Sequence, residues 1–230
     1  MPAKHRWLSV VLVAGSVLLA ACEHKAFEIL SPIPAEQLEV LGVRTPLKSV
    51  HFRDQDGEGV LVLSRVDGQA TDAETEQEVD KVELKATLYA RNGDKAPFAP
   101  RWQIEQETTC PGLDLDVDFY GDVSDVTDLD QDGVAEVTVV SHAFCGGGID
   151  SHDIAIEMRE GQASYTVSGT SLITPAGEES IGGQREDSAS VKNAAQVLRD
   201  HLDAVWQAVY KRPWSEASPA ADDQIGDEVE

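Results

Sequence analysis

The sequence predicts a mainly β domain, an antiparallel sheet with hairpins, with one C-terminal amphipathic α-helix packed on it and α+β as the neighbouring class. Segments in which apolar and polar residues alternate recur along the chain, and such alternation is the pattern of half-buried strands. Turn residues such as Asn92-Gly93 separate them. A single stretch, Ser190 to about Lys211, instead has apolar residues at three- and four-residue spacing.

The start of the chain has the pattern of an export signal. Lys4 and Arg6 precede an apolar run, Trp7 to Ala21, which is shorter than the roughly 20 residues of a spanning helix and typical of a secretory signal. Its ending, Leu19-Ala20-Ala21-Cys22, resembles the bacterial lipoprotein box, in which the cysteine is lipidated and becomes the mature N-terminus. Glu23 is not the aspartate that resembles an inner-membrane retention signal, so we expect an outer-membrane lipoprotein. An ordinary signal peptide with a chance cysteine is the alternative.

The rest of the chain is expected to hold one domain. Residues 22–48 are predicted to be the lipidated N-terminus and an irregular tether, 49–213 a single β-rich domain, and 214–230 an acidic disordered tail. The chain has 18 basic and 42 acidic residues, a formal charge of −24. This charge argues against nucleic-acid binding and favours cation binding, solubility or a basic partner.

The alternating segments can be placed in order along the domain. A hairpin is expected over Ser49 to Arg65 and a polar loop over Asp67 to Asp80. Further strands are expected at Val82–Ala90, Phe98–Thr109, Leu113–Phe119, Glu136–His142, Ile149–Glu157 and Ala163–Leu172, with a loose stretch over Gly177–Arg185. Ser188 is among the candidate caps of the helix, and Pro213 would end it.

The acidic segment DVTDLDQDGVAEVTVV, residues 125–140, predicts a calcium loop between two strands. Asp128, Asp130, Asp132 and Glu136 stand at relative positions one, three, five and nine, and the carbonyl of Val134 is available at seven. Clustered carboxylates repel one another unless a cation lies between them, and calcium accepts six to eight oxygens. An EF-hand would need a glutamate at position twelve, where this chain has valine. An acidic β-turn without an ion is the alternative.

Two other acidic features accompany this loop. The turn Asp54 to Gly57 has the same Asp-Gln-Asp-Gly sequence as the loop, and is interpreted as an ordinary turn, with a diverged repeat as the alternative. Asp114, Asp116 and Asp118 alternate with apolar residues. We expect this ladder to be a solvated face; a second cation site or a surface for a basic partner is the alternative.

With Cys22 lipidated, Cys110 and Cys145 remain. In an oxidising envelope compartment an even pair predicts a disulfide, with buried free thiols as the alternative. His142, Cys145 and His152 also suggest a metal site, but their spacing matches no tetrahedral pattern well.

The centre of the chain resembles a small family of bacterial exported domains. The resemblance rests on the two cysteines, on FYGDVSDVTDLDQDGVAEVTVVSHAFC, and on IAIEMREGQASYTVSGT; the segment GGGIDSHD departs from it. That family is loosely described as surface polysaccharide biosynthesis proteins, has no established function, and implies a cell-surface setting without catalytic residues. The acidic loop alone also resembles the calcium loops of integrin-type propellers, but one intact loop is too few for a propeller of at least four blades.

Together these features predict an envelope lipoprotein with a calcium-stabilised β domain and a binding or structural role. Its expected partners are the membrane, through the lipid, and an envelope polysaccharide or a basic envelope protein. The alternative is an enzyme or accessory factor in surface polysaccharide metabolism, which would use a carboxylate pair such as Asp116 and Asp118 or Glu157 and Glu160.

Overall fold

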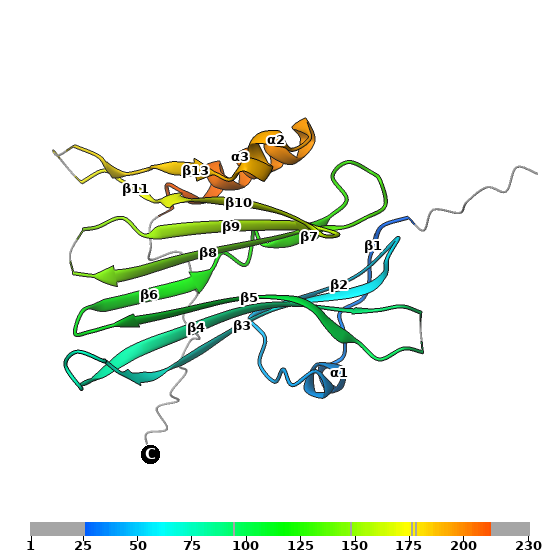
Figure 1. Cartoon of the computed structure of the whole chain (residues 1–230), viewed down its shortest axis with the longest axis horizontal. Helices are drawn as coiled ribbons and strands as arrows, with labels where there is room; N and C mark the ends of the chain where they lie inside the picture. The colour runs from blue at the N-terminus through cyan, green and yellow to red at the C-terminus, as the bar shows by residue number, and fades with distance from the viewer. Residues whose placement is uncertain (1–25, 94, 148, 176, 178, 213–230) are drawn as a thin grey trace, which may run out of the picture.

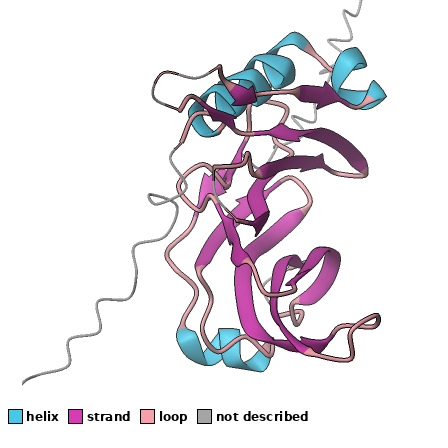
Figure 2. Cartoon of the chain, turned by 90° about the vertical axis from the view of Figure 1, so that its left-hand side faces the viewer, coloured by secondary structure: helices cyan, strands magenta, loops and turns pink. Residues whose placement is uncertain are grey.

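Two antiparallel sheets face each other, and helices cover their outer faces (Figures 1 and 2). The computed structural model describes residues 26–93, 95–147, 149–175, 177 and 179–212. The predicted signal peptide, Cys22 and the acidic tail lie outside these residues. The predicted mainly β, antiparallel class is confirmed. No helix in the described part of the chain is long and apolar enough to cross a membrane.

The first sheet is a meander of five strands in chain order. Its strands are β1 (Glu28–Ile29), β2 (Lys48–Asp54), β3 (Gly57–Thr71), β4 (Glu78–Arg91) and β5 (Ala99–Cys110). The predicted hairpin is β2 and β3, but β3 and β4 run further than expected. The segment predicted as a polar loop, residues 67–80, mostly belongs to the paired ends of β3 and β4. In this part of β3 and β4, few apolar residues are available, and the backbone hydrogen bonds between the two strands hold them together.

The second sheet carries the acidic loop. Its order is β13-β10-β9-β8-β6, and β7 also pairs with β8. Its strands are β6 (Asp114–Phe119), β7 (Asp125–Thr127), β8 (Glu136–Gly146), β9 (Asp153–Glu160), β10 (Ala163–Thr170) and β13 (Arg185–Asp187). A separate two-stranded ribbon joins β11 (Leu172–Ile173) to β12 (Ile181–Gly182). The stretch expected to be loose, residues 177–185, therefore contains β12 and the start of β13.

Three clusters of buried apolar side chains fill the spaces between the two sheets and between the sheets and the helices. Alternating residues of both sheets, such as Leu61 and Val139, fill the space between them. The outer face of the second sheet packs on the C-terminal helices through residues such as Ile156 and Leu202. A third cluster lies between the first sheet and the helix α1 (Ala35–Val40), where Leu38 is buried. Residues 26–48 are thus not only an irregular tether, because β1 adds an edge strand to the first sheet and α1 packs Leu38 against that sheet.

The C-terminal helix differs from its prediction in one respect. The single helix expected from Ser190 is two helices, α2 (Ala189–Asn193) and α3 (Gln196–Val209). Ser188 caps α2, as predicted among the candidates, by accepting a hydrogen bond from the backbone of Val191. Ala194 and Ala195 then adopt extended backbone, with ψ of 163° and 150°. Alanine is a strong helix former, so the sequence carries no signal for this break; Val191 and Leu198 on either side of it both enter the helix–sheet core.

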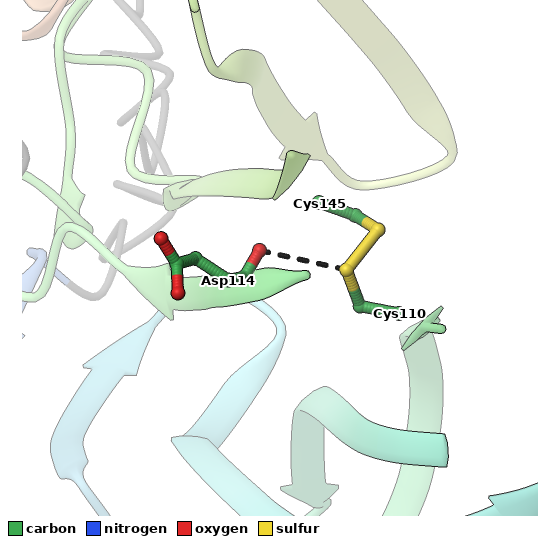
Figure 3. Close-up of a disulfide and its surroundings, with 3 residues drawn as sticks. All are labelled: Cys110, Asp114 and Cys145. Atoms are coloured by element: carbon green, nitrogen blue, oxygen red, sulfur yellow. Dashed lines mark hydrogen bonds between the residues drawn. A yellow bond between two sulfur atoms is a disulfide. The ribbon is translucent and has the colours of Figure 1, made fainter. Parts of the chain in front are cut away.

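A disulfide joins the two sheets. Cys110 ends β5 and Cys145 lies near the end of β8; their Cα atoms are 5.4 Å apart (Figure 3). The Sγ of Cys110, itself buried, lies 3.5 Å from the carbonyl oxygen of Asp114 at the start of β6. The predicted disulfide is therefore present, and Cys145 is not available as a metal ligand.

Candidate functional site: the acidic loop between β7 and β8

The acidic loop lies between two paired strands, as the sequence predicts. Residues 128–135 connect β7 to β8, and Thr127 pairs with Glu136 at the base of the loop. Gln131 and Gly133 have left-handed backbone, with φ of 63° and 87°. A glycine adopts this conformation without strain, which explains why one follows the third acid.

The structure divides the predicted ligands between two overlapping groups. Asp128, Asp130 and Glu136 offer carboxylate oxygens that lie within 4.8 Å of one another. Asp132 belongs to a second such group with Asp130 and Glu160. Among the side chains predicted as ligands, all four acids thus lie in one small region. The N–H of Val134 donates to Oδ1 of Asp132 at 2.7 Å. The role of the Val134 carbonyl as a ligand stays a prediction.

Backbone hydrogen bonds shape the exposed side of the loop. Oδ1 of Asp128 accepts from the N–H of Gly133 at 3.4 Å, and Oδ1 of Asp130 accepts from the N–H of Asp132 at 3.2 Å. Bonds of this kind also occur in acidic turns that hold no ion. These hydrogen bonds are therefore consistent both with a calcium loop and with an acidic turn that holds no ion.

Glu136 is a buried acid with one oxygen left unpaired by the described residues. The residue is 0% exposed. Its Oε2 accepts from the N–H of Leu129 at 2.7 Å, whereas its Oε1 has no hydrogen-bond partner in the described part of the chain. Burial, helped by the charges of Asp130 and Glu160, raises the pKa of Glu136 to about 7. An ionised carboxylate in such a place is costly unless a positive charge accompanies it.

Glu160 was not predicted as part of this site. It ends β9 directly opposite Glu136 in the ladder with β8, and its Oε2 accepts from the hydroxyl of Tyr165 at 3.2 Å. Burial and the charges of Asp130 and Asp132 raise its pKa. Like-charged residues opposite each other destabilise a sheet. Only the register of β8 against β9 identifies this pair, and that register cannot be read from the local sequence.

The Asp54 turn packs against the loop. The N–H of Gln55 donates to the carbonyl of Gly133 at 2.7 Å, and the N–H of Ala135 donates to Oδ2 of Asp54 at 3.1 Å. Asp54 is buried, and burial raises its pKa. The two Asp-Gln-Asp-Gly turns are thus direct neighbours, and the β2–β3 hairpin of the first sheet braces the loop of the second.

Of the two carboxylate pairs suggested for catalysis, Glu157 and Glu160 are kept apart by their strand, whereas Asp116 and Asp118 share one face of β6 but have different partners. Glu157 and Glu160 lie on opposite faces of β9, because they are three positions apart on a strand. Glu157 accepts a hydrogen bond from Arg159 at 2.6 Å. Asp118 is buried and forms an ion pair with Arg65 at 3.2 Å, so this rung of the ladder is not solvated as predicted. Asp116 lies beside His142 instead.

Comparisons of this chain with family models, with curated proteins and with solved structures found no match. The resemblances that the sequence suggests, to exported polysaccharide-related domains and to integrin-type calcium loops, therefore stay predictions.

Proposed function

We propose that the protein is an envelope lipoprotein whose β domain binds one calcium ion at the β7–β8 loop, and that it has a binding or structural role at the cell envelope. One observation carries the calcium part of this proposal. Glu136 is a fully buried acid whose Oε1 has no partner among the described residues, beside Asp128 and Asp130. A divalent cation would compensate the charge that burial otherwise makes costly.

The donor set suits a hard cation. Asp128, Asp130, Asp132 and Glu136 would supply side-chain oxygens and Val134 its carbonyl, and Glu160 lies close enough to add charge or bind a bridging water. Calcium prefers such all-oxygen sets at flexible geometry, whereas magnesium demands a near-ideal octahedron. Extracellular modules bind calcium at about 10⁻⁴ to 10⁻³ M, and we expect this range here.

Calcium should stabilise the protein through Glu136. At 10 mM calcium and the expected affinity, linkage predicts a gain of about 1.4 to 2.7 kcal/mol in the free energy of unfolding. Denaturant unfolding of the full chain at pH 8, with calcium or with chelator, measures it. Glu136→Gln should abolish the gain. Glu186→Gln, which removes an exposed acid outside the loop, is the matched control and should keep it.

The unfolding free energies measured with chelator, without calcium, test the role of Glu136 in a second way. Because the pKa of Glu136 is raised from 4.5 to about 7 in the folded state, its contribution to stability is full below pH 4.5 and is lost as the pH rises through 7. At pH 8 without calcium, Glu136→Gln should therefore be no less stable than the natural protein. Equal calcium gains in both glutamine variants, or none in the natural protein, would leave an acidic turn without an ion.

The lipid anchor is supported by the apolar run Trp7 to Ala21 and by Cys22 behind it. Several acyl chains hold a protein stably on a membrane, since each buried methylene adds about 0.8 kcal/mol. Cys22→Ser should therefore move the exported protein from the membrane fraction to the soluble fraction, as cell fractionation and immunoblotting would detect. Persistence of the variant in the membrane fraction would contradict lipidation at Cys22.

The partner at the envelope is proposed from charge. Without Lys4 and Arg6 the mature chain has 16 basic residues against 42 acidic ones, a charge of −26. A surface of this sign attracts basic protein segments and repels nucleic acids. A basic envelope protein is therefore the partner proposed from charge, and an envelope polysaccharide, the other proposed partner, rests on the resemblance to exported polysaccharide-related domains.

A further inference from the structure

Three side chains of the second sheet meet at a place separate from the acidic loop. They are Asp116 of β6, His142 of β8, and His152, which immediately precedes β9. Each offers a ligand atom, and these atoms lie within 4.8 Å of one another. Glu136 and His142 are six residues apart on β8, or roughly 20 Å along an extended strand. The two clusters are therefore independent.

Sheet register explains why these residues meet. In the β6–β8 ladder Asp116 lies opposite Phe144, and Asp118 lies opposite His142. Asp116 and His142 are therefore diagonal neighbours on one face of the sheet. The backbone of His152 is held from both sides by Ser171, which donates its N–H to the carbonyl of His152 at 2.8 Å and accepts the N–H of His152 at 2.9 Å through its hydroxyl.

Aromatic rings enclose the two imidazoles. The side chain of His142 is 0% exposed and that of His152 6% exposed. Tyr120 packs on His142 with ring centroids 4.8 Å apart, and Phe144 stacks on His152 at 4.5 Å. Both histidines are thus held in place, with little access to water.

Two buried polar atoms of the cluster lack a hydrogen-bond partner among the described residues. Nε2 of His142 lies 3.2 Å from Oδ1 of Asp116, but Nδ1 of His152 and Oδ2 of Asp116 are 3.8 Å apart, too far for a hydrogen bond. Oδ2 of Asp116 and Nδ1 of His142 are buried without a hydrogen-bond partner among the residues described. Buried polar atoms are nearly always paired. Two metal–ligand bonds of about 2.0 to 2.2 Å can span a separation such as 3.8 Å.

We propose that Asp116, His142 and His152 form a second metal site, of the two-histidine, one-carboxylate kind, for a divalent transition metal such as zinc. Imidazole nitrogens suit zinc and its neighbours, whereas calcium takes oxygen ligands. Three protein ligands leave a coordination position open for water or an exogenous ligand. The sequence suggested His142 and His152 beside Cys145 without a fitting spacing; in the proposed site Asp116 takes the place of Cys145, which is in the disulfide.

Zinc and cobalt(II) titrations of the full chain, stripped of metal by chelator, test this site. One equivalent of cobalt should bind and produce visible d–d absorption, and zinc should displace it and raise the melting temperature. Asp116→Asn and His152→Gln should each weaken binding by about tenfold or more. The matched control is His201→Gln, which alters a histidine that contacts Thr138 at 3.0 Å outside the cluster and should bind as the natural protein does.

The outcomes separate this site from the calcium site. Glu136→Gln should keep zinc binding, and 10 mM calcium should not displace the zinc. Circular dichroism establishes that each variant is folded, and Asp116→Asn preserves the size of the side chain it replaces. The proposal is overturned if the natural protein binds neither metal at 100 μM, or if folded Asp116→Asn and His152→Gln both bind as tightly as the His201→Gln control.

Discussion

Replacing both Cys110 and Cys145 by alanine will lower the free energy of unfolding by about 4 kcal/mol. The disulfide closes a loop with a sequence separation of 35 residues, and the chain-entropy model assigns roughly this value to a loop of that length. It also ties β5 of the first sheet to β8 of the second. Denaturant unfolding of the natural protein and the double variant, under identical calcium and pH, measures the difference.

Reduction provides the control for this experiment. A thiol reductant should destabilise the natural protein by a similar amount and leave the double-alanine variant unchanged. The acidic loop lies at the other end of β8, nine residues from Cys145, or roughly 30 Å away. Calcium binding by the folded double variant should therefore persist. A loss below about 1 kcal/mol would show that the reduced chain is already constrained in its unfolded state.

Glu58→Gln will destabilise the protein at neutral pH by about 2 to 3 kcal/mol. In the ladders of the first sheet, Glu58 on β3 lies between Arg53 on β2 and Arg91 on β4. It accepts hydrogen bonds from Nη2 of Arg53 at 2.5 Å and Nε of Arg91 at 2.9 Å, and its side chain is 8% exposed. Burial alone would raise its pKa, but the two arginines outweigh burial and lower the pKa from 4.5 to about 2.

The pH dependence of this effect follows from the sign of the shift. A lowered pKa in the folded state contributes stability that is full above pH 4.5 and is lost as the pH falls toward 2. The shift corresponds to roughly 3 kcal/mol, reduced somewhat because Arg53 is 37% exposed. Unfolding measured from pH 2 to 7 should show the two proteins converging in acid.

Glu83→Gln is the matched control for Glu58. Glu83 lies on β4 of the same sheet and pairs with Lys81, but its side chain is 45% exposed. Exposed ion pairs contribute little, about 0 to 1 kcal/mol. If Glu83→Gln lowered the free energy of unfolding as much as Glu58→Gln does, burial would not explain the larger contribution expected of Glu58 and its two arginines.

Features that depend on local spacing could be predicted from the sequence. Alternation identified most strands, because side chains on a strand point to opposite faces at a period of two. The spacing of Asp128, Asp130, Asp132 and Glu136 placed an acidic loop between two strands, which the structure confirms. The pairing of Cys110 with Cys145 followed from counting cysteines once Cys22 was assigned to the lipid.

Segment ends and breaks were less predictable. The long ends of β3 and β4 contain few apolar residues, so their strand structure depends on pairing with each other. The break at Ala194 and Ala195 lies within a good helical pattern, and it arises where α2 and α3 both pack on the second sheet. In both cases tertiary contacts outweigh local propensity.

By itself, the sequence determined the fold class, the acidic loop and the cysteine pair, because each is a matter of residue type at short range. Only the tertiary structure decided which distant residues meet. It placed Glu160 opposite Glu136, set the Asp54 turn against the loop, and brought His152 to Asp116. These contacts depend on strand register and on how two sheets stack, and a shift of one residue in register would turn each side chain to the other face.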